Sequence, residues 1–364
     1  MNAKSKIINN LIRQEFLKLQ PYPATLTLAQ LAGQLKIPAQ RIVKLNTAEN
    51  AAVAGFYKKN IKISYSSYPD PFCMKLRQAL SGYTGFSPEW IACGNGSDEL
   101  IDLLIALFVS SNEEVLLCPP TFPMYEFCCK IRGVKIKKIS RNESMDINFA
   151  KLKSAITNKT KLIFIDSPGN PTGRMVDEQQ LLSLLEKKII VALDEAYFEY
   201  SGKTSAALVK KYPNLIILRS FSKWAGLAGL RLGYLIANPK VIKAFLLIKP
   251  PYNVNSVAQE LGLLALKKSK SMLKKLQGQL AVKKVIAAKL GRFKGLKVEA
   301  GQGSYIMLKV LNENRDVVIS KLKQRGILVK PVNQPSLTDS FLVSLEDRVK
   351  MEKLVSALKQ VIKE

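Results

Sequence analysis

The feature that most constrains the fold is a regular alternation of short apolar runs with segments of helical spacing. The runs of strand length are residues 91–93, 114–117, 161–165, 189–193 and 215–218. The helical segments are residues 98–109, 125–131, 177–186 and 241–247. Strands that alternate with helices pair in parallel and are buried on both faces. We therefore predict an α/β fold with a mostly parallel sheet covered by helices.

The chain changes character after about residue 270. A long basic segment of helical spacing comes first, followed by strand candidates at 305–310 and 341–345 and helix candidates at 315–325 and 349–362. This pattern indicates a smaller α+β domain. We predict a large domain of residues 46–270. The smaller unit would combine an N-terminal arm, residues 1–45, with residues 271–364.

Composition excludes several kinds of chemistry. The chain has no histidine, so it cannot build a Ser-His-Asp triad, a Cys-His pair or a His-ligated zinc site. We expect no metal centre. The five cysteines form no C-x-x-C pair and indicate buried thiols in a reducing compartment. We find neither a signal peptide nor an apolar stretch long enough to cross a membrane, and we expect a cytoplasmic protein.

The formal net charge of +28 has two interpretations. A strongly basic chain is typical of nucleic-acid-binding proteins, and residues 261–298 contain no acidic side chain. The apolar residues of that segment nevertheless recur at helical spacing, which favours a solvated helix face. We expect no nucleic-acid partner and a surface that attracts anionic small molecules.

Polar residues follow the predicted strands at the edge where parallel sheets bind ligands. They are Gly96, Ser97, Asp98, Asn170, Asp194, Tyr197, Ser220, Ser222, Lys223 and Arg231. Pyridoxal phosphate needs such a set: an amine for a Schiff base and a carboxylate at the ring nitrogen. Its phosphate requires hydroxyls, an arginine and a helix N-terminus. The pattern thus predicts a site for this cofactor.

The sequence around Lys223 resembles the lysine motif of the class I/II aminotransferases, with Ser220 to Lys223 followed by Gly229 to Tyr234. From about Lys44 onward, the chain is similar to the histidinol-phosphate aminotransferase family. The supporting stretches are 44–50, 68–70, 94–100, 118–122, 167–173, 194–197 and 334–337. The resemblance implies fold type I and ping-pong amino transfer between histidinol phosphate and 2-oxoglutarate in histidine biosynthesis. It also implies a homodimer with shared active sites.

The resemblance further implies a role for each site residue. The catalytic residues would be Lys223, which forms the internal aldimine and moves a proton, Asp194 at the ring nitrogen, and Tyr197. The other cofactor contacts would be Asn170 at the phenolic oxygen, Phe122 on the ring face, Tyr68 from the neighbouring subunit, and Gly96, Ser97, Asp98, Ser220, Ser222 and Arg231 at the phosphate. The substrate would meet Asn46, Glu49 and Lys330.

Departures from the family pattern all lie on the substrate side. Leu342 and Lys330 stand where the family has arginines, Ala51 to Val53 replace its Pro-Tyr-Gly, and Ser304 replaces an asparagine. A leucine cannot form a bidentate pair with an anion. Alternatives therefore remain: an aminotransferase with another substrate, or decarboxylation of a phosphorylated amino acid. A non-catalytic basic binding protein is the remote alternative.

Overall fold

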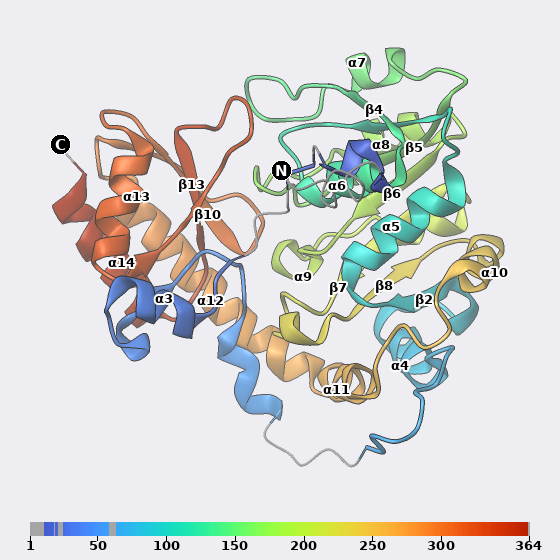
Figure 1. The fold of residues 1–364 in the computed structure, drawn as a ribbon, viewed down its shortest axis with the longest axis horizontal. Coiled ribbons are helices and arrows are strands. Elements are labelled where there is room, and N and C mark those ends of the chain that lie inside the picture. The colour runs from blue at the N-terminus through green and yellow to red at the C-terminus, as the bar shows by residue number, and fades with distance from the viewer. Residues whose placement is uncertain (1–10, 18, 21–24, 58–62, 363–364) are drawn as a thin grey trace.

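The computed structural model describes residues 11–17, 19–20, 25–57 and 63–362 (Figure 1). Its large sheet has seven strands in the order β2-β8-β7-β6-β5-β3-β4. All neighbouring strands pair in parallel except β8, which is antiparallel to β2 and β7. The bounds are β2 Ile91–Gly94, β3 Glu114–Leu117, β4 Lys135–Lys138, β5 Thr160–Asp166, β6 Ile190–Asp194, β7 Leu215–Ser220 and β8 Gly233–Ile236. The predicted mostly parallel α/β sheet is confirmed.

Helices cover both faces of this sheet. Alternate residues of a strand point to opposite faces, so each strand contributes side chains to the core on both sides. Leu162 and Phe164 of β5 join the core under α5 Gly96–Phe108, α6 Pro123–Arg132 and α10 Pro239–Ile248. Ile163 and Ile165 join the core on the other face. That face carries α4 Met74–Thr84, α7 Phe149–Ser154, α8 Glu178–Leu185 and α11 Ser256–Lys267. The short α9 Phe198–Ser201 follows β6.

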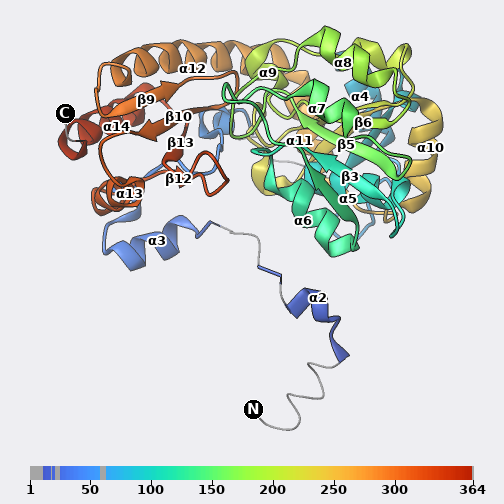
Figure 2. The same cartoon turned by 90° about the horizontal axis from the view of Figure 1, so that it is seen from above.

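A second, antiparallel sheet has the order β12-β13-β10-β9. Its strands are β9 Leu296–Glu299, β10 Tyr305–Val310, β12 Lys330–Pro331 and β13 Ser340–Ser344. The helices of this part are α12 Ser269–Leu290, α13 Arg315–Gln324 and α14 Arg348–Val361. Figures 1 and 2 show this part beside the large sheet, with the long α12 reaching toward α11. The predicted basic helix and the α+β character after it are both present.

Part of the N-terminal segment packs against the C-terminal part of the chain, where it forms a separate two-stranded sheet. Strand β1 Val43–Lys44 pairs in parallel with β11 Ile327–Leu328, and α3 Leu28–Leu35 contributes Leu31 to a cluster with Ile42 and Leu328. The short α2 Gln14–Leu17 lies away from the body in Figure 2, and residues 1–10 of the expected arm lie outside the described residues. The largest apolar core includes residues of both sheets, so the domain boundaries at 46 and 270 stay a prediction.

Strands β4, β8 and β9 were not expected from the sequence. Strand β4 has the sequence Lys-Ile-Lys-Lys and lies at the edge of the sheet, where lysines remain in water. Strands β8 and β9 are four residues each, as long as the predicted β3, and the alternation of apolar and polar residues in β9 was a usable signal. Among the described residues, we find no helix long and apolar enough to cross a membrane and no cluster of three potential metal ligands.

Candidate active site

A cavity of about 300 Å³ opens at the carboxyl ends of β5, β6 and β7, the edge where the sequence placed the ligand site. Ten of the predicted cofactor residues line it: Ser97, Asp98, Phe122, Asn170, Asp194, Tyr197, Ser220, Ser222, Lys223 and Arg231. The predicted substrate residues Asn46, Glu49 and Lys330 line it as well. Residues more than 200 positions apart in the sequence thus meet at one cavity.

Lys223 follows β7, and its amine lies within the cavity. Burial, together with the positive charges of Lys330 and Arg231, lowers the pKa of Lys223 from 10.5 to about 8 against the opposing effect of Asp98. Its Nζ lies 5.9 Å from the centroid of the Tyr197 ring. A lysine in this setting is a usable nucleophile near neutral pH, because a substantial part of it is uncharged.

Asp194 ends β6 and is 5% exposed. The Tyr125 hydroxyl donates to its Oδ2 at 2.7 Å, and the backbone N–H of Ala196 donates to Oδ1 at 2.9 Å. Burial nevertheless raises the pKa of Asp194 from 3.8 to about 7, against the lowering effect of these hydrogen bonds. None of the ion pairs in the described part of the chain includes Asp194, so the site favours a ligand that brings a positive group.

An anion cradle lies at the start of α5. Gly96 has a φ of +82°, which favours glycine, and a Cβ there would lie 2.8 Å from Nη2 of Arg231, whose guanidinium would have to shift. Arg231 pairs with Asp98 at 2.7 Å, and both side chains are about 40% exposed. The Ser220 hydroxyl accepts from the N–H of Ser222 at 3.1 Å. A helix N-terminus, hydroxyls and a guanidinium are the groups that bind phosphate.

Two loops bring Phe122 and Asn170 to the cavity. Phe122 precedes α6 and packs edge-on against Tyr125, with ring centroids 5.6 Å apart. Asn170 lies in the loop after β5, where the Tyr305 hydroxyl donates to the carbonyl of Gly169. Both residues line the cavity and offer a bound molecule an aromatic ring and an amide.

The substrate end of the cavity comes from segments far apart in the chain. Leu342 of β13 pairs in register with Lys330 of β12, and both side chains line the cavity. Burial lowers the pKa of Lys330. Glu49 pairs with Lys44 at 2.7 Å. The Asn46 Oδ1 is buried and has no hydrogen-bond partner among the described residues.

Two predicted residues do not line the cavity. Gly96 is the first residue of α5, next to Ser97 and Asp98, which do line the cavity. Tyr68 is 81% exposed and stacks on Tyr252 with ring centroids 4.4 Å apart, outside the cavity of its own chain. The sequence implied that Tyr68 serves a neighbouring subunit, and its exposure leaves that prediction open.

Sequence reasoning missed several cavity residues, among them Tyr125, Asp166 and Tyr305. Asp166 ends β5 as Asp194 ends β6, so its position at a strand end was a usable signal. Tyr125 and Tyr305 lie within a helix and a strand, where their spacing is that of core residues. Nothing in the sequence distinguishes them from core aromatics.

With this geometry in view, the chain belongs to the family described as aminotransferase class I and II, whose sequence profile matches residues 33–358. The predicted family, fold class and activity class are thereby confirmed. The chain is 35% identical to a histidinol-phosphate aminotransferase of Roseiflexus castenholzii, covering 97% of this chain and 99% of that protein. It is 37% identical to one of Dehalococcoides mccartyi, covering 90% and 92%.

A solved structure supports the fold. The crystal structure of histidinol-phosphate aminotransferase from Sinorhizobium meliloti in complex with pyridoxal-5'-phosphate superposes with a TM-score of 0.83 and 20% sequence identity. The match covers 95% of this chain and 96% of that one. At this level of identity, the similarity establishes a shared fold and does not establish shared ligands.

Proposed function

We propose that the chain binds pyridoxal phosphate in this cavity and transfers an amino group between histidinol phosphate and 2-oxoglutarate, a step of histidine biosynthesis. The observation that carries the proposal is that the Lys223 amine, the Asp194 carboxylate and the Arg231 cradle line one cavity. Relatives named histidinol-phosphate aminotransferases, 35% and 37% identical over most of the chain, support the choice of substrate.

The residues of the cavity fit this cofactor. Pyridoxal phosphate supplies an aldehyde that joins to amines and a protonated ring that withdraws electrons from the substrate Cα. Asp194 would hold the ring cation, because a buried carboxylate without a cation gains most from such a partner. Ser220, Ser222 and Arg231 would hold the phosphate, together with the backbone N–H groups of residues 96–98.

Lys223 would bind the cofactor and carry a proton to and from the substrate at its Nζ. With the pKa of Lys223 lowered to about 8, roughly a tenth of the amine is neutral at pH 7. An amine with a pKa of 10.5 would be neutral in only about one molecule in 3000. Asn170 and Tyr197 would orient the cofactor at the same end. The chain has no histidine, so proton transfer falls to a lysine, a tyrosine, a cysteine or a carboxylate, and among these we assign it to Lys223.

The substrate end of the cavity is suited to a molecule with an anion and an N–H donor. Lys330 provides a positive charge, and the Asn46 Oδ1, for which the described residues offer no partner, can accept a hydrogen bond from a ligand. Leu342 adds an apolar wall beside Lys330. We infer that Lys330 pairs with the substrate's anionic group and that Asn46 accepts from its polar ring. Glu49, already bound by Lys44, would border this end.

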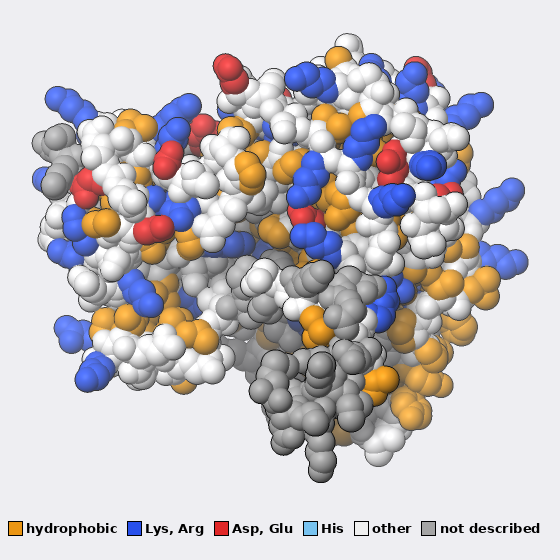
Figure 3. All heavy atoms as spheres, turned by 45° about the horizontal axis from the view of Figure 1, so that its top comes forward, with side chains coloured by type: hydrophobic (Ala, Val, Ile, Leu, Met, Phe, Trp, Pro, Cys, Tyr) orange, Lys and Arg blue, Asp and Glu red, His pale blue; other side chains and the backbone are white. Residues whose placement is uncertain are grey.

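We further propose that the enzyme is a homodimer in which Tyr68 reaches the neighbouring cavity. Tyr68 and Tyr252 stack on the surface, and nearby large hydrophobic side chains are also exposed: Tyr65, Phe72, Leu247 and Ile248. Hydrophobic side chains gather along the lower right edge of the face in Figure 3, the side where α10 lies in Figure 1. Exposed apolar clusters of this kind mark interfaces.

Mixed dimers test the shared site. Co-expression of differently tagged Tyr68→Ala and Lys223→Ala chains, followed by purification of the mixed dimer, combines one native site with one doubly altered site. We expect about half the activity of the native dimer, although each parent variant is weak or inactive. A mixed dimer no more active than the Tyr68→Ala parent would place Tyr68 outside the partner's site.

The central experiment follows the absorbance of added cofactor during amino-donor screening. The purified chain is loaded with pyridoxal phosphate and incubated with histidinol phosphate, glutamate or a phosphorylated amino acid. We expect histidinol phosphate and glutamate each to convert the cofactor to its amine form, and 2-oxoglutarate to reverse the change. Lys223→Ala should bind cofactor without conversion. Release of carbon dioxide from a phosphorylated amino acid, with no conversion by any donor, would refute amino transfer.

A further inference from the structure

A buried ion pair beside the cavity has no role in the steps above. Arg141, just beyond β4, directs Nη2 to Oδ1 of Asp166 at a distance of 2.7 Å, and their side chains are 2% and 3% exposed. Asp166 lines the cavity. Removing both charges from water is costly unless further hydrogen bonds satisfy the remaining donors and acceptors. The other contacts of this pair therefore indicate what it holds in place.

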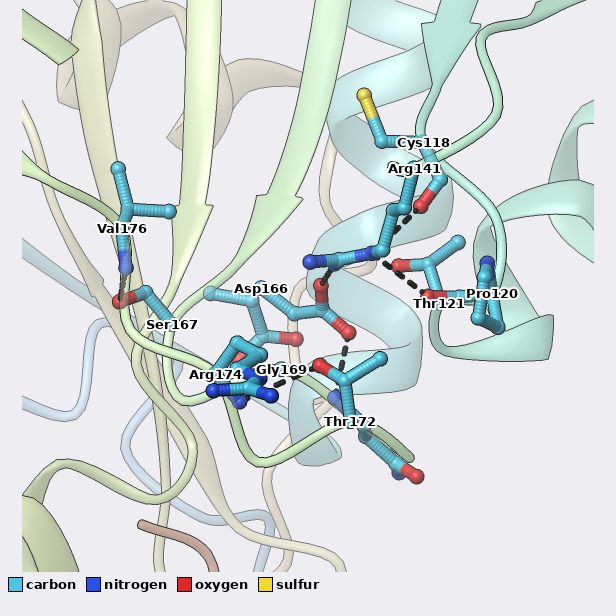
Figure 4. A network of polar contacts seen from close by, with 12 residues as sticks. Cys118, Pro120, Thr121, Arg141, Asp166, Ser167, Gly169, Thr172, Arg174 and Val176 are labelled. Atoms are coloured by element: carbon cyan, nitrogen blue, oxygen red, sulfur yellow. Dashed lines mark hydrogen bonds and ion pairs between the residues drawn. The ribbon is translucent and has the colours of Figure 1, made fainter. Parts of the chain in front are cut away.

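The Arg141 guanidinium binds the turn that leads to Phe122. Its Nε donates to the carbonyls of Cys118 at 3.1 Å and Pro120 at 2.9 Å (Figure 4). Its Nη1 donates to the carbonyl of Met145 at 3.2 Å. Its backbone N–H also donates to the carbonyl of Pro119. The Arg141 guanidinium thus holds the backbone of residues 118–120 in place. Pro120 is two residues from Phe122, the side chain predicted to stack on the ring.

The Asp166 carboxylate binds the loop that carries Asn170. Its Oδ2 accepts from the backbone N–H of Asn170 at 2.7 Å, and the Thr121 side chain also hydrogen-bonds to this carboxylate. Figure 4 shows Arg141 and Asp166 meeting between the two loops. Phe122 and Asn170 are 48 positions apart, yet this pair joins the segments that bear them.

We propose that Arg141 and Asp166 are positioning residues that hold Phe122 and Asn170 at a fixed separation across the cavity, so that both contact one bound ring. The inference rests on the proposed function, since the ring is that of pyridoxal phosphate. Arginine is required because four acceptors surround it, and an ammonium group has only three donors.

The pair also sets the charge next to Asp194. Asp166 and Asp194 are register partners on β5 and β6, and the negative charge of Asp166 is among the causes that raise the pKa of Asp194, after burial. Arg141 offsets that charge. Loss of the Arg141 charge alone would leave the Asp166 and Asp194 carboxylates side by side. Loss of both the Arg141 and the Asp166 charges would leave only the Asp194 carboxylate.

The test compares Arg141→Met, Arg141→Lys, Asp166→Asn and the double variant Arg141→Met/Asp166→Asn. Arg174→Met is the matched control: this arginine lies beside the same loop, is 43% exposed, and approaches carboxylates only at 3.8 and 3.9 Å. Hydrogen exchange of residues 118–122 and 166–173 is measured on the cofactor-free chains. Pyridoxal phosphate dissociation, its absorbance against pH, kcat and KM are measured on the loaded chains.

We expect Arg141→Met to speed exchange in both loops and to weaken cofactor binding and kcat by about tenfold or more, with KM for the oxo acid changed by about twofold at most. Arg141→Lys should restore the absorbance profile, because it keeps the charge, but should not restore binding or slow exchange. The double variant should likewise restore the absorbance profile without restoring cofactor binding or slowing exchange. Arg174→Met should match the native chain in every measurement.

The alternative is that Arg141 and Asp166 only stabilise the fold and do not position Phe122 and Asn170. Lower thermal stability in the Arg141 variants with native cofactor dissociation and native exchange in both loops would overturn the proposal, as would full rescue of binding by Arg141→Lys. If Arg141→Met fails to fold, Asp166→Asn and Arg141→Lys decide the question. Failure of the native chain to bind pyridoxal phosphate would refute the proposed function instead, and the exchange measurements would still report on the loops.

Discussion

Replacing Asp194 with asparagine should stabilise the cofactor-free chain at pH 8 while abolishing amino transfer. Burial raises the pKa of Asp194 from 3.8 to about 7. Between those values, the folded chain holds a proton that the unfolded chain has released, so stability falls as pH rises and stays low above pH 7. Three pKa units correspond to an upper limit of about 4 kcal/mol. Asparagine has no charge to bury, and the Tyr125 hydroxyl can donate to its oxygen or accept from its amide.

Urea unfolding of both chains at pH 4.5 and pH 8 measures this effect. The stability difference between variant and native chain should grow by about 3 kcal/mol from the lower to the higher pH. Comparing the two pH values cancels any packing change that the substitution itself causes. Asp146→Asn is the control, because its side chain is half exposed and water screens its charge. A stability difference that does not change with pH would refute the reasoning.

Three further outcomes follow from the same geometry. The rate at which the cofactor-free chain captures pyridoxal phosphate, followed by stopped-flow absorbance, should rise with pH and level off above the Lys223 pKa of about 8; a rate that still climbs to pH 10 would contradict this. Tyr125→Phe should lower the free energy of unfolding at pH 8 by about 1.5–3 kcal/mol, since a buried charged acceptor loses its donor; urea titration checks it. Gly226→Ala should cost more than about 1 kcal/mol in the same titration, because its φ is +64° and a Cβ would lie 2.6 Å from the Asn50 carbonyl.

The cofactor side of the site was predictable because the rule behind it is local. Parallel strands end at one edge of a sheet, so a polar residue that follows an apolar run must lie at that edge. Asp194 and Lys223 both follow such runs, and both line the cavity. Asp166 follows the same rule, since it lies at the end of β5. It was not predicted as a site residue because its partner, Arg141, comes from a loop without a distinctive pattern.

The substrate side was less predictable because several distant segments build it. Lys330 and Leu342 lie side by side because their strands pair in the second sheet. Asn46 and Glu49 lie in the segment after β1. Register between short strands depends on tertiary packing that no local pattern encodes. Only the family resemblance drew attention to these positions. Tyr125 was not predicted for a different reason. Its helical spacing is that of an ordinary core aromatic, and Asp194, which accepts from its hydroxyl, is 69 residues away.

The absence of histidine makes the pH dependence of this enzyme unusually simple to interpret. In most proteins imidazoles titrate between about pH 5 and 8, but this chain has none, so perturbed lysine and carboxyl groups titrate near that range instead. Lys223 and Asp194, with pKa values of about 8 and about 7, line the cavity; Glu199 and Lys283, each with a pKa of about 8, do not. Ionisation of an amine absorbs considerable heat, whereas that of a carboxyl absorbs almost none. An inflection in cofactor capture that shifts to lower pH on warming therefore belongs to Lys223, and one that stays fixed belongs to a carboxyl group such as Asp194.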